Sequence, residues 1–135
     1  MRFGFLAVLA LLLTAPAASR ADDGAAIAKV IERQIAAFGA DDLPGAFAFA
    51  SPTIQRKFGS PARFGQMVRQ GYPMIWRPSG FRMLKIVKTS AGPVQVVLFR
   101  DGSGQEWEAG YLMRKIGDAW RINGVHVRRR PGTGA

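Results

Sequence analysis

The chain has 135 residues, a formal net charge of +10 at pH 7 and no cysteine. This length suits one domain with a single core. The lack of cysteine excludes disulfides, thiolate metal sites and a cysteine nucleophile, so packing alone must hold the fold.

The N-terminal segment has the layout of a secretory signal peptide. Arg2 precedes an almost unbroken apolar run over residues 3–13, and small residues follow in "TAPAASRADD". The run is shorter than the roughly 20 residues that span a bilayer as a helix. We expect a signal peptide over residues 1–21, cleaved after Ala21; cleavage after Ala17 and an uncleaved anchor are the alternatives. The protein would then be exported, periplasmic or secreted, and not transmembrane after cleavage.

The mature chain is expected to form one domain over residues 22–130, followed by a disordered tail over 131–135. Removing Arg2 and Arg20 from the 19 basic residues leaves 17 against 9 acidic ones, a net charge of +8. The positive charge could bind an acidic component of the cell envelope, or it could serve only to keep the protein soluble. Export disfavours nucleic acid, and no nucleic acid partner is expected.

The residue pattern in the first half of the mature chain predicts helices. Apolar residues fall on one helical stripe over residues 25–38, which predicts the longest helix, with Gly39 as its C-terminal cap. Asp41 or Asp42 can cap a second helix that has Pro44 in its first turn.

Two Ser-Pro pairs predict two further helix starts. A serine accepts a hydrogen bond at the N-cap, and proline tolerates the next position because its missing N–H would be unpaired there. Ser51-Pro52 should begin a helix that ends near Phe58, and Ser60-Pro61 one that ends near Gln70. Their exposed faces would carry a basic surface: Arg56, Lys57, Arg63 and Arg69.

The residue pattern in the second half of the mature chain predicts a β-sheet. Residues 71–80 read as a loop, because two prolines and two glycines break the helical pattern. Strands are then expected over 81–89, 94–100, 105–116 and 120–127, with a hairpin turn at "DGSG". Asn123-Gly124 suggests a bulge, so the face on which His126 lies stays open. The fold class is therefore α+β, with N-terminal helices packed on a curved four-stranded antiparallel sheet.

Three stretches resemble a family of small exported bacterial proteins of unknown function. They are "IAKVIERQIAAFGADDLPGAFAFASPTIQRKFG", "FGQMVRQGYPMIWRP" and "WRINGV". The resemblance implies export and a nuclear-transport-factor-like, or ketosteroid-isomerase-like (cystatin-like), cone fold, which wraps three helices around a bent sheet and often leaves a pocket. It implies no activity.

Several side chains are candidates for such a pocket, although they could equally fill it. They are Tyr72, Trp76, Trp107, Tyr111 and His126. Glu106 and Glu108 should face away from Trp107 and pair with Arg100 or Arg121. The single histidine makes no metal site, so neither a metal nor a cofactor is expected.

Three functions follow as hypotheses. The first is a non-catalytic exported domain that binds a small apolar or anionic ligand or an envelope partner, with no catalytic residue. The second is an enzyme of isomerase or dehydratase type, with Tyr72, Tyr111 or His126 as acid or base. The third is an interaction protein that uses the basic surface and binds in a salt-sensitive way. A homodimer through the sheet is also possible.

Overall fold

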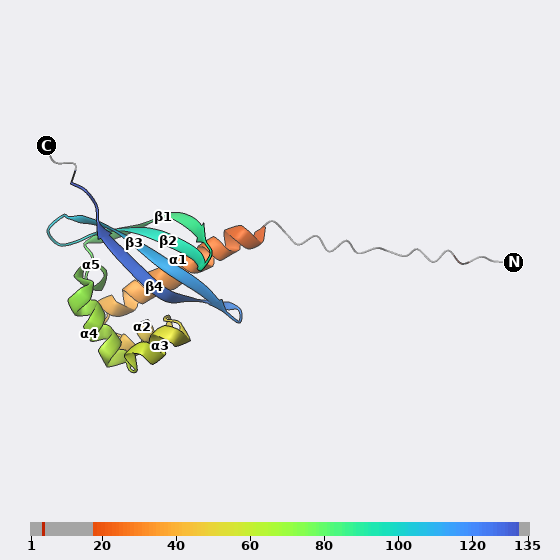
Figure 1. Cartoon of the computed structure of the whole chain (residues 1–135), viewed down its shortest axis with the longest axis horizontal. Coiled ribbons are helices and arrows are strands. Elements are labelled where there is room, and N and C mark those ends of the chain that lie inside the picture. Colours follow the sequence, from red (N-terminus) through yellow and green to blue (C-terminus); the bar gives the residue numbers. More distant parts are fainter. Residues whose placement is uncertain (1–3, 5–17, 133–135) are drawn as a thin grey trace.

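Figure 1 shows the computed structural model of the chain, which describes residue 4 and residues 18–132. Most of the predicted signal peptide and the last three residues of the predicted tail lie outside the described residues. Helices come first along the chain: α1 (Ala18–Gly39), α2 (Leu43–Ala48), α3 (Pro52–Phe58), α4 (Pro61–Gly71) and α5 (Pro73–Trp76). The strands follow: β1 (Gly80–Thr89), β2 (Gly92–Arg100), β3 (Glu106–Ile116) and β4 (Ala119–Arg129).

The helix starts are set by local side-chain chemistry, as predicted. Asp42, Ser51 and Ser60 each accept a hydrogen bond from the backbone N–H three residues further on. These are N-caps of α2, α3 and α4. Gly59 ends α3 with a φ of 82°, a left-handed conformation that glycine adopts without a steric penalty.

The prediction of a loop over residues 71–80 is wrong for residues 73–76, which form α5. Pro73 occupies the first turn of this helix, and the N–H groups of Ile75 and Trp76 donate to the carbonyl of Tyr72. Met74 and Ile75 are buried in the core, so packing stabilises a turn of helix that its own length could not. The longest helix is also longer than predicted, because it already begins at Ala18.

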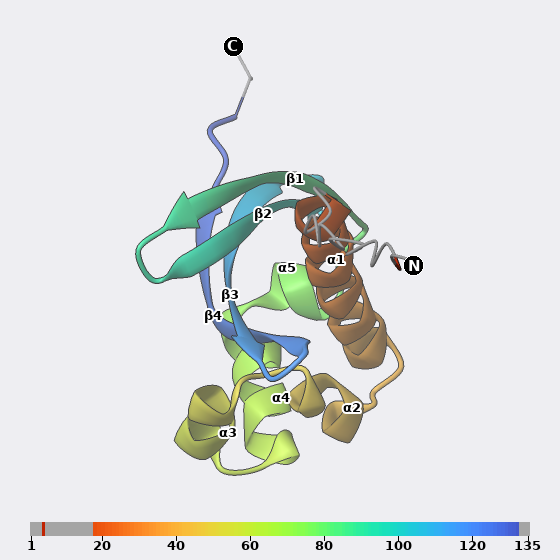
Figure 2. The same ribbon diagram turned by 90° about the vertical axis from the view of Figure 1, so that its right-hand side faces the viewer.

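The sheet is a four-stranded antiparallel meander in the order β1-β2-β3-β4. Figure 2 shows that it curves around the side on which α1 and α5 lie. The core lies between the inner, concave face of the sheet and the helices. Alternation places Val97 and Phe99 of β2, and Ala109, Tyr111 and Met113 of β3, in that core.

The predicted bulge at Asn123-Gly124 is confirmed. Leu112 pairs with Gly124, whereas the next residue of β3, Met113, pairs with Ile122. Asn123 is therefore an extra residue in β4, and the strand changes faces at this point.

Candidate functional site

A cavity of about 260 Å³ lies between the helices and the inner face of the sheet. It is close to the lower end of the range for small-molecule sites, about 300–1,000 Å³. Its walls come from α1, the α2–α3 connection, α3, α4, α5 and the last two strands, and they are mostly apolar. The lining residues are Gln34, Phe38, Ala50, Ile54, Lys57, Phe58, Phe64, Met67, Val68, Tyr72, Ile75, Tyr111, Ile122, Asn123, Gly124 and Val125.

One wall of the cavity is fixed by a contact between the start of α3 and β4. The Ser51 hydroxyl is fully buried; it accepts from the Ile54 N–H at 3.3 Å and donates to Asn123 Oδ1 at 2.7 Å. The backbone joins as well, because the Ser51 N–H donates to the Ile122 carbonyl and the Ile122 N–H to the Phe49 carbonyl. The cap of a short helix thus also holds the bulged part of the sheet in place.

Tyr111 carries a buried hydroxyl that has no hydrogen-bond partner within residues 18–132. Its side chain is fully buried in the middle of β3 and lines the cavity. Among the described residues, no group forms a hydrogen bond with its hydroxyl. Burial raises the pKa of Tyr111 far above its ordinary value, because the phenolate would be poorly solvated. The group is therefore a neutral phenol that can donate or accept one hydrogen bond at the cavity.

The other polar lining residues are distributed from the interior to the surface. Gln34 is buried and donates to the Ala46 carbonyl at 3.1 Å. Tyr72 is half-buried, and Lys57 is exposed. Lys57 carries the single charge among the described lining residues, so the cavity has a positive mouth and a neutral interior.

The structure brings together only two of the five predicted pocket residues, Tyr72 and Tyr111. Trp76 packs on Phe38 with ring centroids 5.6 Å apart and does not line the cavity. Trp107 packs against the core at the start of β3, where its indole N–H donates to the Asp101 carboxylate at 3.0 Å.

His126 lies on the opposite face of the sheet. It pairs with Gly110 and is exposed, so it cannot share a site with Tyr72 and Tyr111. Among residues 18–132, no helix covers this outer face, as Figure 2 shows. The predicted homodimer would use it and stays a prediction.

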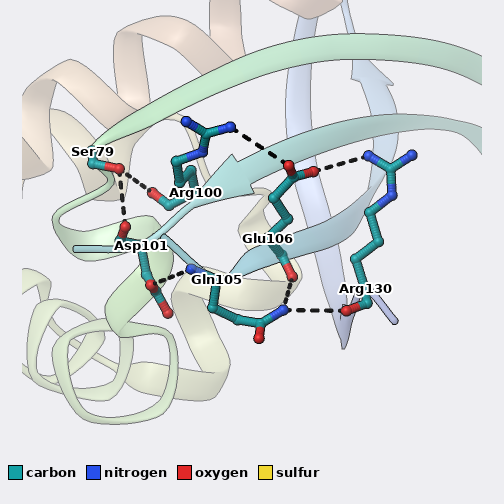
Figure 3. A network of polar contacts seen from close by, with 6 residues as sticks. All are labelled: Ser79, Arg100, Asp101, Gln105, Glu106 and Arg130. Atoms are coloured by element: carbon teal, nitrogen blue, oxygen red, sulfur yellow. Dashed lines mark hydrogen bonds and ion pairs between the residues drawn. The ribbon is translucent and has the colours of Figure 1, made fainter. Parts of the chain in front are cut away.

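Glu106 and Glu108 alternate along β3 with Trp107 and Ala109, which face the core, so both glutamates also lie on this outer face. Figure 3 shows Glu106 between Arg100 and Arg130. Glu106 pairs with Arg100 at 3.6 Å, as predicted, and with Arg130 at 3.0 Å. Pairing with Arg121 is wrong, because Glu108 contacts Arg128 at 2.5 Å instead. Arg121 lies opposite Arg114 near the β3–β4 turn, whereas Arg128 lies directly opposite Glu108 on the adjacent strand. The hydrogen bond from Arg128 holds the pKa of Glu108 below its usual value.

Asp101 anchors the turn between β2 and β3 (Figure 3). Its carboxylate accepts from the Ser103 hydroxyl at 2.6 Å, from the Trp107 indole at 3.0 Å and from the Gln105 N–H at 3.0 Å. These bonds, first the one from Ser103, lower the pKa of Asp101 to about 2.

We therefore expect Asp101→Asn to destabilise the protein in a pH-dependent way. A depressed pKa means that the carboxylate stabilises the fold above about pH 4, and that this contribution is lost as pH falls toward 2. The difference in unfolding free energy between wild type and variant, measured by urea titration from pH 6 to pH 2.5, should shrink as pH falls. Asp118→Asn, in the exposed turn before β4, is the matched control, and an equal profile for both variants would contradict the prediction.

The predicted basic surface is only partly connected with the cavity. Arg56, Lys57, Arg63 and Arg69 are all exposed, and within residues 18–132 none of them pairs with a carboxylate. Lys57 alone lines the cavity. The described residues contain no helix that is long and apolar enough to cross a membrane. They also contain no cluster of three or more potential metal-ligating side chains.

Fold and cavity together define a small α+β domain with an apolar pocket between its helices and a curved sheet. The chain belongs to the family described as "Domain of unknown function (DUF4864)", which matches residues 20–135. Neither a curated protein nor a solved structure matches the chain.

Proposed function

We propose that this domain is a non-catalytic, exported protein that binds a small, largely apolar molecule carrying at least one hydrogen-bonding group. The observation that carries the proposal is the Tyr111 hydroxyl, which is fully buried beside a cavity of about 260 Å³ and has no partner among the described residues. An unpaired buried hydroxyl costs about 1–3 kcal/mol. A ligand that supplies the missing partner would recover this free energy on binding.

The same geometry supports binding over acid-base catalysis. Tyr72 and Tyr111 both line the cavity, but its described lining residues include neither a carboxylate nor a histidine. The raised pKa of Tyr111 keeps the phenol protonated near neutral pH, so it cannot act as a general base there. Hydrogen bonding to a bound molecule is the role that this group can fill.

Native mass spectrometry of the protein purified from its own cells tests the proposal. We expect wild-type protein to carry a small molecule, and Val125→Phe to lose it, because Val125 lines the cavity and a larger ring would fill it. Val87→Phe makes the same replacement at an exposed strand position outside the cavity and should keep the molecule.

Two results would contradict the proposal. One is a clean wild-type mass under conditions that preserve non-covalent complexes. The other is a molecule retained equally by both phenylalanine variants, because it would then be bound outside the cavity.

A further inference from the structure

The cavity has two chemically different ends. Lys57 is the one exposed residue among the described lining residues, so it marks the mouth. Tyr111 is fully buried and marks the interior. The other lining side chains are mainly aliphatic and aromatic, among them Ile54, Phe58 and Val68. A ligand that fills this space would have one end in contact with water and the rest in an apolar environment.

No carboxylate in the described part of the chain neutralises the positive charge at the mouth. Within residues 18–132, Lys57 forms no ion pair. Its ammonium lies over the ring of Phe58, 5.6 Å from the centroid, and Phe58 itself lines the cavity. The charge is thus held beside the opening rather than directed away from it.

The remaining polar groups of the cavity also favour an acceptor. Asn123 uses its side-chain oxygen to accept from Ser51, which leaves its amide N–H groups as donors. Tyr72 and Tyr111 can each donate a phenolic O–H. A cavity with an ammonium, several donors and no carboxylate among its described lining residues suits a ligand that carries negative charge.

We propose that the ligand is a small monocarboxylic acid, bound with its carboxylate at Lys57 and its uncharged part in the apolar interior, where an oxygen atom pairs with Tyr111. This inference rests on the proposed function. A carboxylate at the mouth keeps part of its hydration, whereas the same charge beside Tyr111 would have to be desolvated. A single lysine is matched to one negative charge, and the cavity volume suits a short or single-ring acid rather than a long acyl chain.

The test compares two probes of the same shape, 3-(4-hydroxyphenyl)propionate and its uncharged amide, by isothermal titration calorimetry at pH 7. The acid should bind the wild-type chain about three- to tenfold more tightly than the amide at low ionic strength, and the preference should fall in high salt. Lys57→Met should abolish the preference, because the acid then has no positive charge to pair with at the mouth. Arg56→Met is the matched control, because Arg56 is the exposed neighbour on α3 that does not line the cavity, and it should keep the preference.

The outcomes separate this inference from the proposed function. If acid and amide bind with equal affinity and Val125→Phe abolishes the binding of both, the preference for a carboxylate is overturned, and the cavity remains a binding site. A preference that survives Lys57→Met would overturn the role of Lys57. If neither probe binds, this class of acid is overturned, and the co-purification experiment decides the proposed function alone. Acid binding that Val125→Phe does not change would overturn both proposals.

Discussion

Replacing Phe38 by alanine should lower the free energy of unfolding by about 3–5 kcal/mol. Phe38 is 1% exposed and lies where α1 meets the later helices. Its ring contacts those of Phe64 and Trp76, with centroids 5.9 and 5.6 Å away. The side chain also borders the cavity, so its loss would enlarge an existing void that the neighbours cannot easily close. Urea unfolding followed by far-ultraviolet circular dichroism measures the change.

Phe81→Ala is the matched control for this experiment. Phe81 is 40% exposed on β1, although its ring also contacts another ring, that of Phe99. We expect a loss of about 1 kcal/mol or less, because most of the cost of removing a large side chain comes from complete burial. Similar losses for Phe38→Ala and Phe81→Ala would mean that the junction of α1 with the later helices is not part of the tightly packed core.

Replacing Tyr111 by phenylalanine should raise the free energy of unfolding of the ligand-free protein by about 1–3 kcal/mol. The substitution keeps the ring and removes only a buried hydroxyl that has no partner among the described residues. The same substitution should weaken binding of 3-(4-hydroxyphenyl)propionate, because its phenol would lose its partner. A protein that becomes more stable while it binds more weakly is the expected pattern for a residue kept for function.

Tyr72→Phe provides the comparison, because this half-buried side chain lines the same cavity nearer the surface. Its effect on unfolding should stay within about 0.5 kcal/mol. Chemical denaturation of both variants, after removal of bound molecules by refolding, measures the difference. If Tyr111→Phe were instead destabilised by 1 kcal/mol or more, an ordered water would be the partner of the hydroxyl.

The helix starts could be predicted from the sequence because their chemistry acts within three residues. Ser51 and Ser60 cap the helices that follow them wherever those helices pack. The helix α5 could not be predicted in this way. Pro73 fits a turn as well as a helix start, and burial of the adjacent Met74 and Ile75, a property of the whole fold, decides between them.

The candidate site was less predictable, because its residues come from distant parts of the chain. Tyr72 and Tyr111 could be selected as aromatic residues that suit a pocket, but nothing in the local pattern connects Lys57 or Asn123 with them. The bulge adds a second difficulty. Without an extra residue at Asn123, simple alternation from the buried Ile122 would place His126 on the inner face. With the extra residue, His126 lies on the outer face of the sheet.

The backbone bonds between the start of α3 and β4 have a further consequence for the edges of the sheet. β4 ends the sheet, and such a strand usually offers free backbone groups to a strand of another molecule. Here Ala50 forms a parallel bridge with Ile122, in which the Ile122 carbonyl accepts from the Ser51 N–H and the Ile122 N–H donates to the Phe49 carbonyl. The middle of β4 is therefore closed to incoming strands. Within residues 18–132, β1 pairs with a strand on one side only, so a further strand could add at its other edge.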